Sequence, residues 1–559
     1  MRIAVIDKTK CQPRKCNFTC ISVCPGVKTG KKTIVEENNF PVIYENLCIG
    51  CGICVKKCPF NAIKIENLAE EKGYLAYRYG KNGFGIFNLP IPDKGVGVII
   101  GSNGIGKTTT LKILSGSLKV DFQNFPKQAQ DWLKEERSVV VKPQELKISK
   151  KEKVKDVILR NDERKVAPEI IKKLELNDSL DKDLDELSGG ELQRVAIACA
   201  CCKKAEFYFF DEPCSFLDIK QRLNVAEVLK DLSKEANVLV IEHDLAVLDY
   251  LADYVYIIYG KPGVFGVCSN KKNARVGVNE YLFGFLKSEN VRIRDFEYTF
   301  EKKPPASEWK GKKYVEYPSF EKKWPSFELK VEGGRLIKGE VVGLVGPNAI
   351  GKTTFVRVLA GEIDIGKKID LGKVAYKPQY LNINSEKTVF DFLNSQKLDQ
   401  AIFEETKSFV SELFDKQVNT LSGGELQRVA IVNALCLPSE ICLLDEPSAY
   451  LDIEQRISLA KLIKKITEKT ERISLVVDHD ISFIDSISNR LIVFNGEPGK
   501  KGFANAPVSM REGMNSLLKN FDITFRRDKD TGRPRMNKKG SQKDIEQKKM
   551  GEYYYVISE

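Results

Sequence analysis

The sequence predicts an α/β protein made of two tandem copies of one domain, preceded by a small α+β domain. Five short motifs occur twice in the same order, and eight of the fifteen cysteines lie within the first 58 residues. A chain of 559 residues is also long enough for three or four domains of about 150 residues each. The expected limits are 1–75 for the cysteine-rich domain, 76–295 and 314–510 for the two copies, 296–313 for a linker and 511–559 for a basic C-terminal segment.

The composition disfavours membrane and secreted proteins. No apolar run approaches the roughly 20 residues that span a bilayer, and the start, MRIAVIDKTKC, lacks the apolar core of a signal peptide. We therefore expect a soluble, intracellular protein, in which clustered cysteines indicate metal rather than disulfides. The net charge of +12 mildly favours a polyanionic partner, although a merely basic soluble protein has the same composition. The scattered cysteines are interpreted as small core residues: Cys199, Cys201, Cys202, Cys214, Cys268, Cys436 and Cys442.

The internal repeat is defined by the order and spacing of its motifs. The pairs are GSNGIGKTT and GPNAIGKTT, VKPQ and YKPQ, two copies of LSGGELQRVAI, FFDEPCSFLDIKQR and LLDEPSAYLDIEQR, and two histidine motifs. The later pairs are separated by one nearly constant distance, whereas Lys107 and Lys352 of the first pair are slightly further apart. The first copy therefore contains a small insertion around DFQNFPKQAQDWLKEERS. Motifs that recur at one offset indicate a duplicated domain.

Each copy contains a GxxxxGK[ST] motif between an apolar strand and a helix-prone stretch, which is the setting of a P-loop. Its glycines let backbone amides wrap phosphates, and the helix N-terminus favours the anion. The lysines Lys107 and Lys352 are expected on the β- and γ-phosphates, and Thr108 and Thr353 on Mg²⁺. The predicted ATP-binding residues are Gly101, Ser102, Asn103, Gly104, Ile105, Gly106, Lys107, Thr108 and Thr109, with Gly346, Pro347, Asn348, Ala349, Ile350, Gly351, Lys352, Thr353 and Thr354.

Each copy also contains an apolar strand that ends in an acidic pair. FYFF precedes Asp211 and Glu212, and ICLL precedes Asp445 and Glu446. The aspartates can hold Mg²⁺, and the glutamates can orient or deprotonate the water that attacks the phosphate. A single acidic pair could instead be a solvated turn, but its repetition with a downstream proline disfavours that interpretation.

The repeated LSGGE motif resembles the signature of ABC-type ATPases. It opens a helix, so its serine and glycine amides can face an anion. In that family the signature of one cassette completes the ATP site of the other, which implies a pseudo-twofold pair of cassettes within this chain. The expected signature residues are Ser188, Gly189, Gly190, Ser422, Gly423 and Gly424.

The same resemblance implies two composite sites. Site 1 combines the first P-loop with the second signature, and site 2 combines the second P-loop with the first signature. In the family a histidine at a strand end contacts the γ-phosphate, and His243 and His479, the only histidines of the chain, share one repeat position. The implied catalytic residues are Glu212, Glu446, His243, His479, Gln144 and Gln379, and the implied magnesium ligands are Thr108, Gln144, Asp211, Thr353, Gln379 and Asp445.

Aromatic residues upstream of each P-loop are candidates for stacking on adenine. They are Tyr79 and Phe84 in the first copy and Trp324 and Phe327 in the second. A place in the core is an equally open interpretation for aromatic side chains of this kind.

The first 58 residues contain two runs of four cysteines. CIGCGICVKKCP has the CxxCxxCxxxCP spacing of bacterial-type ferredoxins, and CQPRKCNFTCISVCP is a wider variant. Eight thiolates suit two [4Fe–4S] clusters in a ferredoxin-like domain, and zinc is the alternative. Because the fourth cysteine of each run binds the other cluster in two-cluster ferredoxins, the expected sets are Cys48, Cys51, Cys54 and Cys24, and Cys11, Cys16, Cys20 and Cys58.

This combination resembles the ribosome-recycling twin-ABC ATPases, also called the RNase L inhibitor family. The resemblance covers almost the entire chain and includes KCQPRKCNFTC, DEPSAYLD, VLDYLAD and ITFRRDKDTGRPRMNK. It implies an ATPase that splits ribosomes after termination or rescue, stays on the small subunit during early initiation and aids ribosome biogenesis or export. The implied partners are small-subunit rRNA, a release factor or its rescue paralogue, and initiation factors. The implied state is a cytoplasmic monomer with an internal pseudo-dimer, and a nuclear location is also open.

Three features depart from the family pattern. The family has a helix-loop-helix insertion in the first cassette, and here that insertion is short. Ala349 stands where the first P-loop has Gly104, and a positive φ at that position would cost alanine about 1 kcal/mol or more. Cys214 follows the first acidic motif where the second has Ser448. We expect both sites to bind ATP and to differ in turnover.

The resemblance also implies two hinge segments. The first would join LDIKQRLN with ENVRIRD, and the second LDIEQRIS with ITFRRDKDTGRPR. From Arg526 to Lys549 the chain has ten basic and four acidic residues. We expect this segment to contact the rRNA backbone, where base sequence matters little; a solvated charged tail is the alternative.

In the expected mechanism ATP binding draws the cassettes together and closure moves the cluster domain between the ribosomal subunits. Two alternatives use the same motifs. One is the ATPase subunit of a transporter, and the other is a protein in which ATP gates electron transfer from the clusters.

Overall fold

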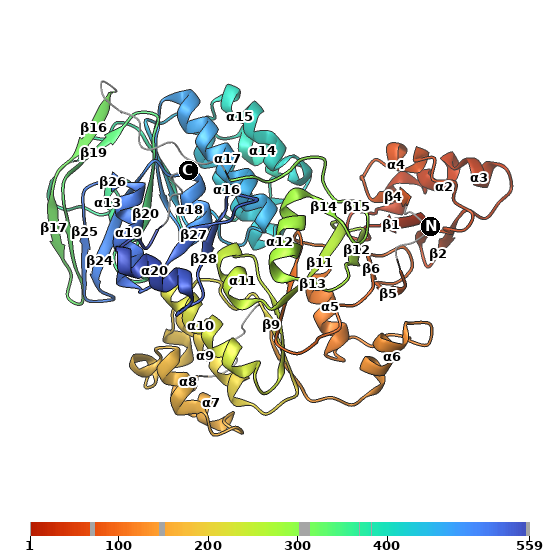
Figure 1. Ribbon diagram of the computed structural model, residues 1–559. Coiled ribbons are helices and arrows are strands. Elements are labelled where there is room, and N and C mark those ends of the chain that lie inside the picture. The colour runs from red at the N-terminus through yellow and green to blue at the C-terminus, as the bar shows by residue number, and fades with distance from the viewer. Residues whose placement is uncertain are drawn as a thin grey trace.

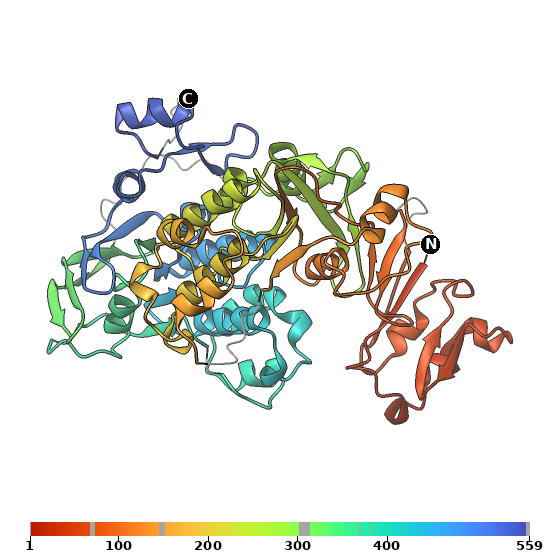
Figure 2. The ribbon, with the colours of Figure 1, turned by 90° about the horizontal axis from the view of Figure 1, so that it is seen from below.

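The computed structural model describes residues 2–67, 73–144, 151–300, 313–367, 369–381 and 383–554. Figure 1 shows two cassettes packed against each other, with the cysteine-rich domain projecting from the first cassette. Seen from below, the C-terminal helix and the cysteine-rich domain lie at opposite ends of the molecule (Figure 2). No helix among the described residues is long and apolar enough to cross a bilayer.

The cysteine-rich domain is a small α+β fold. Its strands are β1 (Arg2–Ile6), β2 (Ile34–Glu37), β3 (Phe40–Ile43) and β4 (Ile63–Asn67), and its helices are α1 (Pro13–Cys16), α2 (Thr19–Val23), α3 (Pro25–Lys28) and α4 (Ile53–Lys57). β1 pairs with β4 and β2 with β3, both antiparallel, and α2 packs on α4. Four of the cysteines share its core with Ala4, Ile34 and Ile43. The small core depends on the cysteine positions, because few other apolar side chains are available.

The first cassette is built on a nine-stranded sheet in the order β5-β6-β12-β11-β7-β10-β9-β8, with β13 beside β11. The strands are β5 (Leu75–Arg78), β6 (Gly85–Phe87), β7 (Val96–Ile100), β8 (Val139–Lys142), β9 (Phe207–Asp211), β10 (Asn237–Ile241), β11 (Tyr254–Lys261), β12 (Phe265–Cys268) and β13 (Lys272–Asn273). The central strand β7 is buried along its whole length between its parallel neighbours β10 and β11. This explains the apolar VGVII before the P-loop, because a parallel strand covered on both faces is apolar throughout.

The second cassette repeats this sheet strand for strand. Its order is β17-β18-β25-β24-β20-β23-β22-β21, with β26 beside β24. The strands are β17 (Phe320–Lys323), β18 (Glu328–Val331), β20 (Val341–Val345), β21 (Val374–Lys377), β22 (Ile441–Asp445), β23 (Ile473–Val477), β24 (Arg490–Glu497), β25 (Lys501–Ala504) and β26 (Val508–Ser509), with a separate pair β16 (Tyr314–Tyr317) and β19 (Gly334–Ile337). The matching orders confirm the duplicated α/β fold.

Helices surround both sheets. In the first cassette they are α5 (Lys107–Leu114), α6 (Lys127–Lys134), α7 (Val154–Arg160), α8 (Ala167–Lys173), α9 (Gly189–Cys202), α10 (Ile219–Leu232), α11 (Leu245–Leu251) and α12 (Ala274–Phe283), with 3₁₀ turns η1 (Asn177–Ser179) and η2 (Leu184–Glu186). In the second they are α13 (Lys352–Leu359), α14 (Val389–Asn394), α15 (Gln400–Thr406), α16 (Gly423–Cys436), α17 (Ile453–Thr470), α18 (Ile481–Ile487) and α19 (Met510–Asn520), with η3 (Lys407–Phe409), η4 (Ser411–Leu413) and η5 (Val418–Thr420).

The insertion in the first cassette forms the single helix α6. Its Trp132 ring packs edge-on against Phe207 at a centroid distance of 4.3 Å, and the Arg137 guanidinium lies 4.5 Å from the Trp132 ring centroid. Trp132 is buried, so the inserted helix belongs to the cassette core. One helix, rather than a helix-loop-helix pair, stands between α5 and β8.

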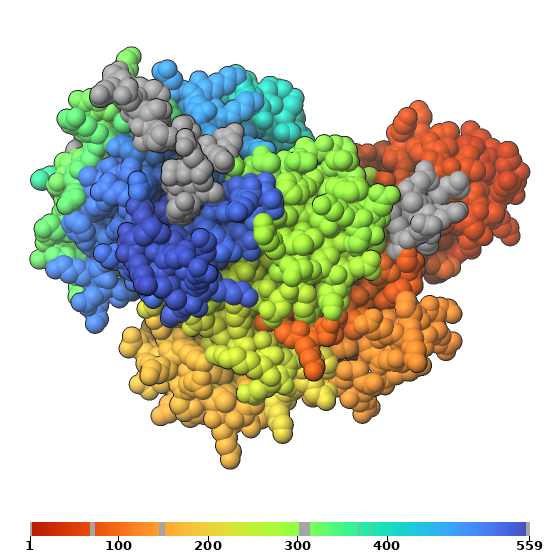
Figure 3. All heavy atoms as spheres, in the orientation of Figure 1, coloured from red at the N-terminus to blue at the C-terminus, as the bar shows by residue number. Residues whose placement is uncertain are grey.

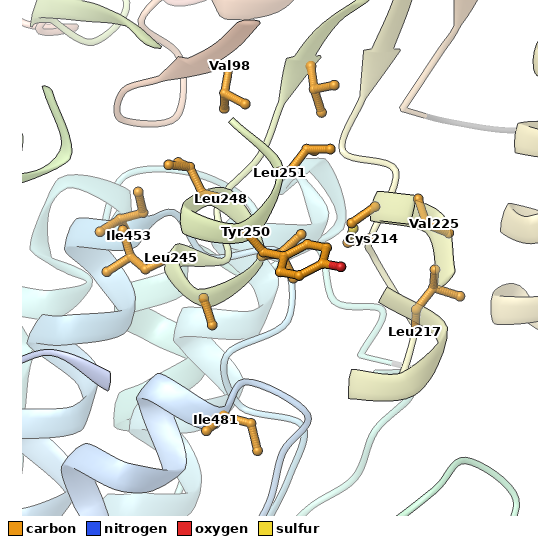
Figure 4. Packing of buried hydrophobic residues seen from close by; sticks show 14 of the residues in the cluster. Val98, Cys214, Leu217, Val225, Leu245, Leu248, Tyr250, Leu251, Ile453 and Ile481 are labelled. Atoms are coloured by element: carbon orange, nitrogen blue, oxygen red, sulfur yellow. The ribbon is translucent and has the colours of Figure 1, made fainter. Parts of the chain in front are cut away.

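The two cassettes share a continuous apolar core. The cluster contains Leu245 and Leu248 of α11 together with Ile453 and Ile481 of the second cassette (Figure 4). Burying apolar surface is worth about 25 cal/mol per Å². This shared core holds the cassettes together where the helices that follow the histidine turns meet.

The C-terminal segment packs between the cassettes, in contrast to the solvated-tail alternative. Its elements are β27 (Phe525–Arg527), β28 (Pro534–Met536) and α20 (Gln542–Met550). A separate short pair, β14 (Phe285–Leu286) and β15 (Val291–Arg292), lies at the end of the first cassette. β28 contacts α11 of the first cassette and α18 of the second. Figure 3 shows this segment, in blue, lying against the yellow-green elements of the first cassette. The segment therefore connects the two cassettes, and we call the part from β27 to α20 the brace.

Three arginines of this segment are neutralised within the chain. The side chain of Arg533 is inaccessible to solvent and makes two hydrogen bonds to Asp249, at 2.9 and 3.1 Å. Arg535 pairs with the same carboxylate at 3.2 Å, and Arg527 with Asp485 at 2.7 and 2.8 Å. The expectation that the whole basic segment faces rRNA is therefore wrong for these three arginines, because buried carboxylates already bind them.

The expected hinge pairing also differs. Arg294, in ENVRIRD, donates to Glu454 at 2.6 Å, and Glu454 belongs to LDIEQRIS of the second cassette rather than to LDIKQRLN. The guanidinium of Arg294 also lies 4.1 Å from the Tyr298 ring centroid. The segment that follows each cassette in the sequence thus contacts the other cassette. Closeness in the sequence does not predict these contacts.

Candidate active site

Each P-loop connects a buried central strand to a helix. β7 leads into α5 in the first cassette and β20 into α13 in the second. Gly104 and Ala349 occupy equivalent positions with φ values of 71° and 55°, in the left-handed region. Alanine is strained there by about 1 kcal/mol, whereas glycine is not. The expected strain at Ala349 is therefore present in the second P-loop.

The ammonium group of each P-loop lysine donates hydrogen bonds to carbonyl oxygens of its own loop. Lys107 Nζ donates to the carbonyl oxygens of Gly101 and Ser102 at 2.8 and 2.9 Å, and Lys352 Nζ donates to that of Gly346 at 3.0 Å. Both lysines are buried, and burial lowers the pKa of each. A buried ammonium group beside glycine-rich backbone amides can bind a phosphate chain.

The acidic pairs lie at the ends of β9 and β22, beside the P-loop threonines. Thr108 Oγ1 donates to Asp211 Oδ2 at 2.8 Å. Both carboxylate oxygens of Asp445 are buried and have no well-formed hydrogen bond among the described residues. Burial raises the pKa of Asp445 to about 6. A buried carboxylate without a hydrogen-bond partner next to a threonine hydroxyl fits a Mg²⁺ site, since magnesium prefers oxygen ligands.

Two further lysines hold the acidic strand ends and were missed by the sequence analysis. Lys142 Nζ donates to Asp211 O at 3.0 Å, and Lys377 Nζ donates to Asp445 O at 2.7 Å. Burial lowers the pKa of Lys142 and of Lys377 to about 8. The signal was present in the repeated KPQ motif, where a lysine ends an apolar strand.

The histidines lie next to the glutamates. His479 Nε2 is 3.5 Å from Glu446 Oε1, and His243 Nε2 is 3.6 Å from Glu212 Oε1. Burial, and then the positive charges of Lys107 and Arg456, lower the pKa of His243 well below its usual value. A neutral imidazole has one N–H to donate, which suits contact with a phosphate oxygen.

The glutamines occupy different positions in the two sites. Gln379 Nε2 donates to Glu446 Oε1 at 2.8 Å, whereas Gln144 is exposed. Burial alone would raise the pKa of Glu446, but His479 and Lys352 outweigh it and hold this pKa at about 2. Glu446 is therefore a carboxylate at neutral pH, able to accept a proton or orient water.

Contacts between the cassettes join each P-loop to the acidic motif of the other. Asn103 N donates to Asp452 Oδ2 at 2.7 Å, and Asn348 N donates to Asp218 Oδ2 at 2.9 Å. These reciprocal bonds define a pseudo-twofold relation between the cassettes. The sequence analysis missed both aspartates, although each stands in a repeated Leu-Asp dipeptide after the acidic motif.

Aromatic residues of the same two loops meet at the pseudo-twofold axis. The Phe216 and Tyr450 rings pack edge to face, with centroids 5.7 Å apart. Both residues have positive φ, 65° and 63°, which is rare for aromatic residues. Strained backbone at matching positions indicates that the loops are shaped by contact with the opposite P-loop.

A cleft of about 1690 Å³ opens at site 1. Lys107 of the first P-loop and Ser422 of the second signature line the same cleft, as the composite-site prediction requires. Asn61 and Lys64 of the cysteine-rich domain border it as well. At site 2 the first signature approaches the second P-loop, where a Cβ on Gly190 would lie 3.8 Å from Asn348 Nδ2.

The aromatic candidates for adenine stacking lie beside the P-loops. Phe84 packs against Gly106, where an added Cβ would meet its ring at 2.9 Å, and Phe327 occupies the equivalent place at Gly351. Tyr79 Oη is 3.1 Å from Thr109 Oγ1. The Trp324 and Phe327 rings are 6.1 Å apart. The first cassette therefore offers an exposed tyrosine at the cleft, whereas Trp324 of the second is half-buried against the core of its cassette.

Several cysteine thiols of the two runs lie near one another. Burial is the largest cause that raises the pKa of Cys54 to about 11, and the nearby thiols of Cys48, Cys51 and Cys24 raise it further. Burial likewise raises the pKa of Cys11, and the nearby thiols of Cys16 and Cys58 add to this effect. Mutually close thiols are the donor set of an iron–sulfur cluster. No three such side chains meet closely enough to hold one metal ion in the described part of the chain.

ATP binding at site 2 is expected to weaken as the pH rises through about 8. Burial lowers the pKa of Lys352 to about 8, and a bound phosphate raises it again. The complex then carries more protons than the free protein above pH 8, so affinity should fall by up to about tenfold per pH unit. Nucleotide titrations from pH 7 to 9 in a Lys107→Ala background test this. Lys352→Arg, which stays charged, should give a flat profile; equal slopes for both proteins would contradict the expectation.

Family models match three parts of the chain. A model described as ABC transporter matches residues 85–215 and 333–449. A possible Fer4-like domain in RNase L inhibitor, RLI, matches 1–32, and a 4Fe-4S binding domain matches 41–64. The matches cover both cassettes and both cysteine runs.

The chain is similar over its whole length to several known proteins. A model of ribosome-bound archaeal Pelota and ABCE1 contains a chain with a TM-score of 0.93 and 48% identity, covering 99% of both chains. The complex of archaeal ribosomal stalk protein aP1 and archaeal ribosome recycling factor aABCE1 gives a TM-score of 0.81 and 47% identity, covering 87% of this chain and 100% of the other. Translation initiation factor RLI1 of Chaetomium thermophilum is 40% identical, covering 99% and 97%.

The fold, the two composite sites and the cysteine domain define a twin-cassette ABC-type ATPase with an iron–sulfur domain. Relatives match the chain across nearly its full length. The chain belongs to the RNase L inhibitor family, whose solved members include ABCE1.

Proposed function

We propose that this ATPase splits ribosomes into subunits after termination or rescue. The observation that carries the proposal is the cleft of site 1, which both cassettes and the cysteine-rich domain line together. A nucleotide in that cleft touches all three parts, so its binding and loss can move the cysteine-rich domain. The similar archaeal protein named a ribosome recycling factor supports the same function.

The proposed cycle follows from the site residues. ATP enters with its phosphates on the P-loop lysines, and Ser422 and Ser188 close on the γ-phosphates held by Lys107 and Lys352. Only the closed form uses both contacts, so ATP favours closure. Glu212 or Glu446 then orients the attacking water. Loss of the γ-phosphate removes the shared contact, and the cassettes reopen.

The remaining roles extend this assignment. Thr108, Asp211 and Gln144 at site 1, and their counterparts Thr353, Asp445 and Gln379 at site 2, would hold Mg²⁺, which would supply positive charge to neutralise the phosphates. His243 and His479 contact the γ-phosphates, and the upstream aromatic residues stack on adenine. The domain limits proposed are 1–75, 76–295, 296–313, 314–510 and 511–559.

We infer two [4Fe–4S] clusters in the cysteine-rich domain. Iron–sulfur clusters in such a domain supply a rigid cross-link between short helices, besides their redox chemistry. The sets are Cys48, Cys51, Cys54 and Cys24, and Cys11, Cys16, Cys20 and Cys58. The expected result is eight iron atoms and eight acid-labile sulfides per anaerobically purified chain. Cys54→Ser should halve both counts; four iron atoms in the unaltered protein would contradict the assignment.

The partners proposed are the ribosomal small subunit, a release factor or its rescue paralogue, and initiation factors, in a cytoplasmic protein that also enters the nucleus in nucleated cells. The similar ABCE1 chains occur together with Pelota or with a ribosomal stalk protein, and one relative is named a translation initiation factor. Contact with the rRNA backbone falls to the exposed lysines of the C-terminal segment rather than to its buried arginines. These lysines are Lys529, Lys538, Lys539, Lys543 and Lys549.

Sucrose-gradient sedimentation of purified ribosomes with the protein and ATP tests the function. Subunits should appear when ATP and the partner factor are present, and the protein with Glu212→Gln and Glu446→Gln should remain on the small subunit. The proposal is wrong if the protein stays at the top of the gradient at low salt, with or without a non-hydrolysable nucleotide.

A further inference from the structure

The two ATP sites differ in one buried contact between the acidic turn and the histidine turn. In site 2 the backbone N–H of Ser448 donates to Asp478 Oδ2 at 3.0 Å, and its hydroxyl donates to Asp478 Oδ1 at 2.7 Å. Asp480 N donates to the same Oδ1 at 2.9 Å. Ser448 lies two residues after Glu446, and Asp478 directly precedes His479. One carboxylate therefore joins the turns that carry both groups.

Site 1 has Cys214 and Glu242 at the equivalent positions. Glu242 Oε1 accepts from His243 N at 2.7 Å and from Asp244 N at 3.0 Å, both in its own turn. Glu242 Oε2 is buried and has no hydrogen-bond partner among the described residues. Cys214 is buried in the apolar cluster that contains Leu217 (Figure 4). The carboxylate of site 1 thus stabilises its own turn, and the side chain that it meets on the acidic turn is the weak donor Cys214.

The chemistry of the exchange explains this difference. A serine hydroxyl is a strong donor, whereas a thiol is a weak one and packs like a small apolar group. Burial, and then the neighbouring Glu242, raise the pKa of Cys214 well above its usual value, so the thiol keeps its proton. A protonated thiol is a much weaker donor than the hydroxyl with which Ser448 bonds Asp478 in site 2, whereas the backbone N–H is common to both residue types.

The surroundings of the two pairs are otherwise matched. Arg456 Nη1 donates to Asp480 Oδ2 at 2.8 Å, and Arg222 makes the equivalent bond to Asp244. Each of these aspartates caps the helix after its histidine turn, α18 or α11. The helices are therefore anchored alike, and between these two turns the sites differ in the Ser–Asp and Cys–Glu pairs.

We propose that Ser448 and Asp478 are positioning residues that hold Glu446 and His479 in register, and that Cys214 and Glu242 give site 1 only a weaker connection. Site 2 is then assembled before the cassettes close, which agrees with the bond from Gln379 to Glu446. Site 1 completes its catalytic arrangement only on closure. The inference rests on the ATPase roles proposed above and needs no ribosome.

Turnover of single sites tests the inference. In a Glu212→Gln background, which reports site 2, Ser448→Ala and Ser448→Cys should lower kcat about fivefold to tenfold, the value of roughly one lost hydrogen bond. The KM for ATP should stay within about twofold, and Ser448→Thr, which keeps the hydroxyl, should recover most of the rate. In a Glu446→Gln background, Cys214→Ser combined with Glu242→Asp should raise kcat at site 1 about threefold or more.

Controls separate positioning from folding. Cys199→Ser makes the same thiol-to-hydroxyl change on α9, away from both pairs, and should alter neither rate. Unchanged kcat for Ser448→Cys would overturn the inference, as would equal losses in Ser448→Thr and Ser448→Ala, because then the hydroxyl does not position the site. Because the assay contains no ribosomes, such a result would leave the ribosome-splitting proposal untouched.

Discussion

Glu446→Gln is expected to lower ATP hydrolysis at site 2 by at least about 100-fold, the usual contribution of a general base, while ATP still binds. The Glu446 carboxylate accepts from Gln379 at 2.8 Å and lies 3.5 Å from His479. Its pKa of about 2 keeps it charged, so the uncharged amide removes the only strong proton acceptor at that position. Single-turnover hydrolysis in a Glu212→Gln background measures the effect.

The matched control for this change is Glu497→Gln, a carboxylate on an exposed turn of the same cassette. It should hydrolyse ATP at the unaltered rate. Nucleotide binding to each variant, followed by fluorescence, separates loss of chemistry from loss of binding. If the variant that carries both Glu212→Gln and Glu446→Gln hydrolyses ATP within threefold of the rate of the unaltered protein, another group activates the water.

Arg533→Ala is expected to destabilise the cassette pair by about 3–5 kcal/mol. Arg533 is completely buried, and its loss leaves the carboxylate of Asp249 without its main partner. An uncompensated buried charge is costly, whereas removal of both partners costs less. For domains of this size the thermal midpoint should fall by about 10 °C. Thermal unfolding followed by circular dichroism measures it.

A double-mutant cycle gives the control for the brace. Arg533→Ala combined with Asp249→Ala should lose less stability than the sum of the single variants. Lys529→Ala, an exposed position in the same segment, should leave the midpoint unchanged. Additive losses would mean that Arg533 and Asp249 act separately, and the C-terminal segment would not be the brace described above.

The motifs that carry local chemistry were predictable from the sequence. A P-loop or an acidic strand end is recognised by residue types within a few positions, because the strand and the helix that flank it have their own apolar patterns. Duplication strengthened each prediction, since the second copy repeats the strand order of the first. The sharing of one cluster by Cys54 and Cys24 stays a prediction, made from a spacing rule.

Contacts between distant segments were not predictable in this way. Asp452 meets Asn103 across the cassette interface, and Arg294 meets Glu454 rather than the nearer first-cassette motif. Nothing in local spacing identifies which carboxylate a guanidinium will reach after folding. The basic C-terminal segment shows the consequence: composition indicated rRNA contact, whereas burial assigns Arg533 to an internal ion pair.

The most direct test of the account is a structure of the Glu212→Gln and Glu446→Gln protein with Mg²⁺ and ATP. The account predicts that Ser422 Oγ lies within hydrogen-bond distance of the γ-phosphate held by Lys107, and Ser188 Oγ within that distance of the γ-phosphate held by Lys352. A structure in which each nucleotide is held by one cassette alone, with both serines distant from the opposite triphosphate, would contradict it.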